Sequence, residues 1–182
     1  MSKKKIAVLV GSLRKNSNSG HIANALIALA PESLEMNIVE IGNLPLYNQD
    51  YDSDSPKEYD AFRAAIKGSD GFLFITPEHN RTMSAVLKNA IDVASRPWGQ
   101  NVWAGKPGAV VSSSIGPIGG ALANHAVRQP MVLLDVHMMQ QPEAYIGTVQ
   151  NYFDENGEVN NEDTKAFLQS YINAFESWVQ KF

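Results

Sequence analysis

The stretch Ile6-Ala7-Val8-Leu9-Val10-Gly11-Ser12-Leu13-Arg14-Lys15-Asn16-Ser17-Asn18-Ser19 carries the strongest structural signal in this chain. Its first five residues are typical of a strand buried on both faces of a parallel sheet, and a helical pattern follows the polar loop. Amide N–H groups at a helix start are unpaired and the helix dipole is positive there, so this order predicts an anion site. The loop contains polar side chains that suit a terminal phosphate: Ser12, Arg14, Asn16, Ser17, Asn18 and Ser19.

Two common nucleotide motifs are missing from this loop. No Gly-Lys-Ser/Thr closes it, which argues against a P-loop nucleotide hydrolase, and the spacing G-x-G-x-x-G of dinucleotide sites is not present either. On these residues alone, an ordinary turn with a serine or asparagine cap remains the simpler alternative. The rest of the chain must decide between a cap and a binding loop.

Composition indicates one ordinary globular domain over residues 1–182. The chain is 44% hydrophobic and 19% charged, and its net charge of −4 argues against nucleic acid as the main partner. It has no cysteine, which excludes disulfides and thiolate metal sites. Only five apolar residues follow Lys3–Lys5, too few for a signal peptide or a membrane span. We therefore expect a cytoplasmic protein without a membrane partner.

Strand and helix patterns alternate along the chain. Apolar runs at residues 6–10, 37–41, 71–75, 108–111 and 131–136 predict five strands. Helical spacing separates the runs, and it is clearest over residues 167–182. This alternation predicts an α/β fold with three layers, doubly wound around a five-stranded parallel sheet. In such folds the ligand lies beyond the carboxyl ends of the strands.

Two further loops follow carboxyl ends and have unusual compositions. The loop at residues 76–84 begins with Pro77, which ends the strand, and Glu78, His79 and Asn80 follow at once. The simpler reading of this loop is a surface turn with a weak Glu78–Arg81 ion pair. The loop at residues 112–120 contains serines and glycines that let backbone approach a flat group.

Together the three loops predict a site for a mononucleotide with a planar ring system. His79 has no second histidine at ligand spacing, so no metal site is expected. The loop serines have no identifiable histidine and aspartate partners, and no pair of carboxylates suggests hydrolysis of glycosides. We assign no catalytic residue, and we expect a cofactor to carry the chemistry.

The sequence resembles the NAD(P)H-dependent FMN reductase family, which includes flavodoxin-like quinone, azo-dye and chromate reductases. Three stretches in the same order carry the resemblance over most of the chain. The first is the 11–19 loop, and the second runs from Pro77-Glu78-His79-Asn80 into Leu87-Lys88-Asn89-Ala90 and the following helix. The third spans residues 105–120, with Arg128-Gln129 after it.

The resemblance implies a flavodoxin-like fold that binds FMN and oxidises NADPH or NADH. Hydride would pass through the flavin to a quinone, an azo compound, a metal oxyanion or free flavin. The family pattern implies homodimers or homotetramers, with residues 88–97 and 128–129 near the interface. The alternative for these two segments is that their charges cover helix surface that faces solvent. The cofactor-binding residues that it implies are Ser12, Arg14, Ser17, Ser19, Pro77, Glu78, His79, Asn80 and Ser113. To these we add Asn18 from the first loop and Gly116 from the third.

Two positions depart from the commonest family pattern: His79 replaces a tyrosine, and Ser19 replaces a frequent asparagine.

The alternative function is that of a flavodoxin-type electron carrier, which holds FMN but does not oxidise pyridine nucleotides. Such carriers commonly use a T-x-T-G-x-T loop and are more acidic, and this chain has neither feature.

Overall fold

A computed structural model of the chain describes residues 3–182. Its parallel sheet has the order β2-β1-β3-β4-β5, and the short β6 also pairs with β4. This is the flavodoxin-like, doubly wound order, so the predicted fold class is confirmed. The strands are β1 (Lys4–Val10), β2 (Leu34–Ile38), β3 (Gly71–Pro77), β4 (Pro107–Ser113), β5 (His137–Met138) and β6 (Ala144–Ile146).

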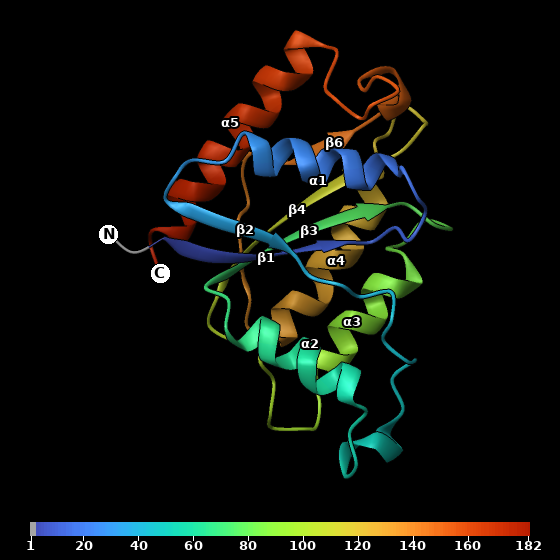
Figure 1. Cartoon of the computed structure of the whole chain (residues 1–182), viewed down its shortest axis with the longest axis vertical. Helices are drawn as coiled ribbons and strands as arrows, with labels where there is room; N and C mark the ends of the chain where they lie inside the picture. Colours follow the sequence, from blue (N-terminus) through green and yellow to red (C-terminus); the bar gives the residue numbers. More distant parts are fainter. Residues whose placement is uncertain (1–2) are drawn as a thin grey trace.

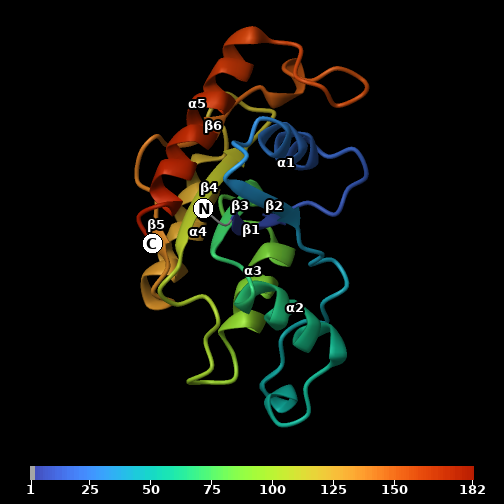
Figure 2. The same cartoon turned by 60° about the vertical axis from the view of Figure 1, so that its left-hand side comes forward.

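Five α-helices within the described residues form the two outer layers (Figures 1 and 2). α1 (Asn18–Ala28) and α5 (Glu162–Val179) cover one face of the sheet. The opposite face is covered by α2 (Lys57–Lys67), α3 (Ala85–Ser95) and α4 (Ala121–Leu133). Short 3-10 turns occur at Gln49–Asp52 and Val149–Asn151.

The core divides in two because successive side chains of a strand point to opposite faces. In β1, Ile6 and Val8 pack on the α1 and α5 side, whereas Ala7 and Leu9 pack on the other side. Both faces of the central strands are therefore apolar, which explains the nearly continuous hydrophobic runs in the sequence.

The strand prediction at residues 131–136 is wrong. Met131 is buried on α4, which continues to Leu133, and the next strand starts only at His137. A short apolar run cannot distinguish a strand from the end of a buried helix, which explains the error. The fifth strand is also split into β5 and β6, so the sheet has six strands where five were predicted. The second strand lies earlier than predicted, at Leu34–Ile38.

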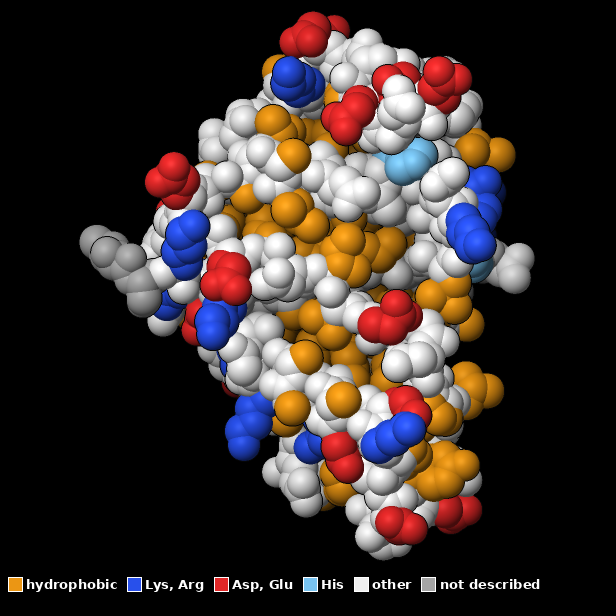
Figure 3. Space-filling model, in the orientation of Figure 1, with side chains coloured by type: hydrophobic (Ala, Val, Ile, Leu, Met, Phe, Trp, Pro, Cys, Tyr) orange, Lys and Arg blue, Asp and Glu red, His pale blue; other side chains and the backbone are white. Residues whose placement is uncertain are grey.

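The fold places the predicted loops around a switch in winding direction. β1 leads into α1 on one face, and β3 leads into α3 on the other face. The carboxyl ends of these neighbouring strands therefore open a crevice, which is where α/β folds of this kind bind ligands. Figure 3 shows hydrophobic side chains gathered between α1 and α2 on one face of the molecule, with charged groups of both signs around them. None of the helices within residues 3–182 is long and apolar enough to cross a membrane.

Candidate functional site

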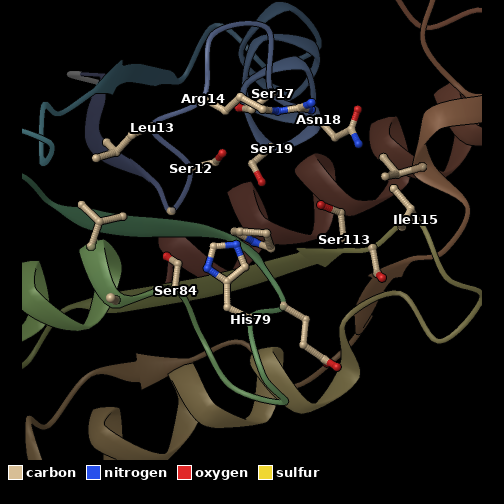
Figure 4. Close-up of a pocket in the computed structure, with 17 residues that line it drawn as sticks. Ser12, Leu13, Arg14, Ser17, Asn18, Ser19, His79, Ser84, Ser113 and Ile115 are labelled. Atoms are coloured by element: carbon tan, nitrogen blue, oxygen red, sulfur yellow. The ribbon is translucent and has the colours of Figure 1, made fainter.

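The loops after β1, β3 and β4 enclose a cavity of about 510 Å³ (Figure 4). A cavity of this volume is in the range of cofactor sites. It brings together most of the residues that the sequence predicts for the site. These are Ser12, Arg14, Ser17, Asn18, Ser19, Pro77, Glu78, His79 and Ser113.

The first wall is the start of α1. Ser17 occupies the N-cap in an extended conformation, and its Oγ accepts a hydrogen bond of 3.0 Å from the Gly20 amide. The first amides of the helix have no partner within the helix, so they are available to a ligand. Figure 4 shows Arg14 beside Ser17, Asn18 and Ser19 along this wall. A guanidinium and a helix start on one side of a cavity suit an anion.

The second wall is a tight turn after β3. The amides and carbonyls of His79 and Thr82 exchange two hydrogen bonds of 3.0 Å, and the two residues between them have positive φ angles. His79, at the base of the turn, lines the cavity. Asn80, at its tip, lines a neighbouring hollow of about 660 Å³ that His79 also borders. Its role in binding a cofactor stays a prediction.

Glu78 links this turn to the third wall through its side chain. Its Oε2 accepts hydrogen bonds from the amides of Leu122 (3.1 Å) and Ala123 (3.3 Å) at the start of α4. Its Oε1 lies 3.0 Å from Arg81 Nη1, as the simpler reading of the loop predicted. Because Gly120 at the N-cap has no side chain, Glu78 provides the cap from a distant loop. No sequence pattern predicts this contact.

The third wall is the loop after β4. Ser113 is buried and lines the cavity, whereas Gly116 does not. The carbonyl of Gly116 accepts a hydrogen bond from the Thr148 amide (3.1 Å), so this part of the loop turns toward the chain after β6. Gly119, with φ +67°, packs so closely on Tyr145 that a side chain there would clash with backbone.

Several cavity residues were missed at the sequence level. The apolar side chains of Leu13, Val86, Ile115 and Val149 line it, and so does Ser84 at the start of α3. Within residues 3–182, Ser84 Oγ is one of two buried side-chain polar atoms without a hydrogen-bond partner. Leu13, Ser84 and Ile115 belong to the three predicted loops, whereas Val86 and Val149 lie outside them and were joined to the cavity only by the fold.

Two residues of the family-like stretches have structural contacts. Asn89 in α3 accepts a hydrogen bond from the Tyr47 amide (2.8 Å) and donates to the carbonyl of Pro45 (2.9 Å). It thereby anchors the loop before the 3-10 turn at Gln49–Asp52. Arg128 in α4 donates to Asn124 and to the Met139 carbonyl, both at 2.9 Å.

The cavity fits FMN. Arg14 and the α1 start supply positive charge and donors for a phosphate at one end, and apolar side chains line the walls for a planar ring. No group of three or more His, Asp or Glu side chains within the described residues is placed to hold a metal ion.

The fold and this cavity define a flavodoxin-like protein whose site lies at the carboxyl edge of the sheet. The chain belongs to the NADPH-dependent FMN reductase family, whose model matches residues 4–151. It is thus an oxidoreductase that uses FMN and NAD(P)H. This confirms the resemblance seen in the sequence.

Individual relatives match over nearly the whole chain. A quinone reductase of Pseudomonas putida is 56% identical over 96% of this chain and 94% of its own length. A 2-hydroxy-1,4-benzoquinone reductase of a Burkholderia species is 49% identical over 97% of this chain and 96% of its own length. Among solved structures, the flavoenzyme NAD(P)H:(acceptor) oxidoreductase FerB of Paracoccus denitrificans has a TM-score of 0.92 and 43% identity, with 98% of each chain covered.

Proposed function

We propose that the cavity between the three loops binds FMN and that the enzyme passes electrons from NAD(P)H to quinones. The observation that carries this proposal is the meeting of a charged helix start with two further loops at one sheet edge. When bound, FMN supplies the redox chemistry, because its ring system takes up a hydride equivalent from a nicotinamide and returns the electrons to an acceptor. The protein contributes binding, orientation and electrostatics.

The α1 wall would hold the phosphate. Arg14 supplies a full positive charge, and the first-turn amides of α1 add the partial positive charge of the helix start. Ser17 Oγ accepts a hydrogen bond from the Gly20 amide, so the hydrogen of its own hydroxyl is free to donate to a phosphate oxygen. Ser12, Asn18 and Ser19 complete the set of donors on this wall.

The other two walls would orient the ring. His79 and Ser113 lie across the cavity from the α1 wall (Figure 4), and Pro77 also lines the cavity. The carboxylate of Glu78, bonded to the α4 start, holds the 78–83 turn against the loop after β4. The apolar side chains of Ile115 and Val149 also line the cavity.

The names of the relatives support a quinone as the electron acceptor. One relative is named for 2-hydroxy-1,4-benzoquinone, a small and polar quinone. Azo compounds, metal oxyanions and free flavin remain predictions, as does a cytoplasmic location.

We also propose that copies of this chain associate. Trp98, which follows the predicted 88–97 interface segment, is 80% exposed, and Val132 and Leu133 on α4 are 85% and 77% exposed. Large exposed apolar side chains on or next to the predicted segments support an interface. Light scattering after size exclusion should give at least twice the 19.9 kDa mass of one chain.

The test of the proposed function is NAD(P)H oxidation by the purified, FMN-loaded protein. We expect slow oxidation by oxygen alone and much faster oxidation after a benzoquinone is added, with NADH and NADPH compared at equal concentration. Protein freed of FMN is the control and should regain activity with FMN. A yellow protein that oxidises neither nucleotide with any quinone would instead favour the electron-carrier alternative.

A further inference from the structure

The hollow of about 660 Å³ beside the cavity is lined by the turn after β3, by α3 and by α4. The hollow and the cavity share two lining residues, His79 and Ala85, so the two spaces adjoin at this turn. Figure 4 shows the imidazole of His79 directed into the cavity. Most of the residues that line the hollow are exposed. A space that is open to solvent and borders the cavity suits a molecule that enters and leaves in each turnover.

The lining of the hollow combines apolar surface with hydrogen-bond donors. The apolar residues are Met83, Ala85, Ala126 and Pro130. The residues with polar side chains are His79, Asn80, Thr82, Lys88 and Gln129. Sites for small molecules commonly have apolar walls and a few polar groups that fix the orientation of the ligand. A small ring with carbonyl oxygens, such as a quinone, matches this lining.

Lys88 carries the one permanent charge among the residues that line the hollow, and no Asp or Glu of residues 3–182 lines it. Its Nζ donates to Oδ1 and Oδ2 of Asp92 at 2.8 and 2.6 Å. The two side chains are 51% and 38% exposed, so water screens this pair and its net energy is small. An ammonium group has three hydrogens, so Nζ retains a donor for a second acceptor. The hollow therefore favours a ligand with negative charge.

We propose that the electron acceptor binds in the hollow and that Lys88 makes the enzyme favour quinones that carry a negative charge. This inference rests on the proposed function. A hydroxyl group on a quinone ring is conjugated with a carbonyl and ionises as a carboxylic acid does, so a hydroxyquinone is an anion at neutral pH. In the reaction NAD(P)H loses a hydride, and the quinone carbonyls gain two electrons and two protons, the second proton coming from water. Lys88 is a specificity-determining residue and takes no part in this transfer.

Two acceptors of similar size but different charge test the proposal. These are 2-hydroxy-1,4-benzoquinone, an anion, and 2-methoxy-1,4-benzoquinone, which has no acidic hydroxyl. The kcat/KM of the FMN-loaded enzyme is measured with each quinone at saturating NADH, and the ratio of the two values is the preference for the anion. For Lys88→Met we expect this preference to fall by about twofold to fivefold, the effect of one exposed ion pair. Lys88→Arg keeps the charge and should retain the preference. Because the predicted interface segments border the hollow, the enzyme is assayed in the oligomeric state in which it is purified.

Two controls separate the local charge of Lys88 from other effects. Lys165→Met removes the same charge from an exposed lysine of α5, on the opposite face of the sheet, and should leave the preference unchanged. Lys88→Met also leaves Asp92 unpaired, so the substitution is repeated in an Asp92→Asn background, where no free carboxylate repels the anion. Asp92→Asn by itself should raise the preference, because Nζ of Lys88 then has no competing partner.

Ala126→Phe tests the hollow itself. Ala126 lines the hollow but not the cavity, so the larger side chain should raise the KM of both quinones severalfold. The dissociation constant of FMN, measured by fluorescence titration of the apoprotein, should stay the same and shows that the variant is folded.

The proposal is overturned if Lys88→Met keeps the preference of the unmodified enzyme, or if Lys165→Met loses as much of it. It is also overturned if Ala126→Phe leaves the KM of both quinones unchanged. An unmodified enzyme that oxidises NAD(P)H with neither quinone would instead refute the proposed function, and this inference with it.

Discussion

Ser17 and Ser84 precede two helices that begin at the same cavity, but their hydroxyl groups differ. Ser17 Oγ accepts a hydrogen bond from Gly20 at 3.0 Å, whereas Ser84 Oγ has no partner within the described chain. The start of α4 provides a third case, because its cap is the carboxylate of Glu78 from another loop. A serine before a helix therefore does not by itself show whether its hydroxyl caps the helix.

The largest effect should come from the α1 wall, where the charge is greatest. Arg14→Ala removes a charge-assisted hydrogen bond of roughly 1.5–3 kcal/mol, so FMN affinity should fall by about tenfold to a hundredfold. Equilibrium titration of the apoprotein measures this. Arg14→Lys keeps the charge and should lose less. An unchanged dissociation constant for FMN would place the phosphate elsewhere.

Removing the distant cap of α4 should have the next largest effect. Glu78→Ala leaves the amides of Leu122 and Ala123 without their acceptor, and we expect the free energy of unfolding to fall by about 1–2 kcal/mol. Urea unfolding of the apoprotein gives this value. Glu78→Gln retains an acceptor oxygen and should be less destabilised. Equal stability of the alanine variant and the unmodified protein would contradict the role as a cap.

Ser17→Ala should reduce the apoprotein's unfolding free energy by about 1 kcal/mol, since it removes the hydrogen bond to the Gly20 amide. The same urea titration measures the loss. Ser17→Asn, which can also cap, is the control and should recover most of the stability. Should Ser17→Ala unfold at the same urea concentration as the unmodified protein, Ser17 and Ser84 would not differ as the structure indicates.

The smallest effect should be on the stability of the Ser84→Ala apoprotein. No hydrogen bond of the described chain is lost, so we expect a change within about 0.5 kcal/mol, or a slight gain. Urea unfolding of Ser17→Ala and Ser84→Ala under the same conditions compares the free energies of unfolding of the two variants directly. A loss of stability for Ser84→Ala as large as that for Ser17→Ala would mean that the hydroxyl supports the apoprotein.

Much of the fold could be predicted because it depends on local patterns. The apolar run in β1 reflects a strand that is buried on both faces. The helical spacing in α5 reflects a helix that buries one face against the sheet. The prediction failed at residues 131–136, where α4 ends and a split strand follows. There, pairing with β4 and not the local pattern determines where the strand begins.

The site was predictable only where its residues are neighbours in sequence. The 12–19 loop, Pro77, His79 and Ser113 could be proposed because each follows a strand end. Asn80 and Gly116 do not line the cavity, and the Gly116 carbonyl is bonded to the Thr148 amide. That these residues bind FMN stays a prediction.

The sequence by itself determined the parallel sheet and the polar loop from Gly11 to Ser19, because strand periodicity and helix-start chemistry act over a few neighbouring residues. The tertiary structure alone decided that Glu78 caps α4 and that Ser84 faces Gly11 with a free hydroxyl. Hydrogen bonds between distant segments depend on how the helices pack on the sheet. Two serines with the same local position therefore have different partners.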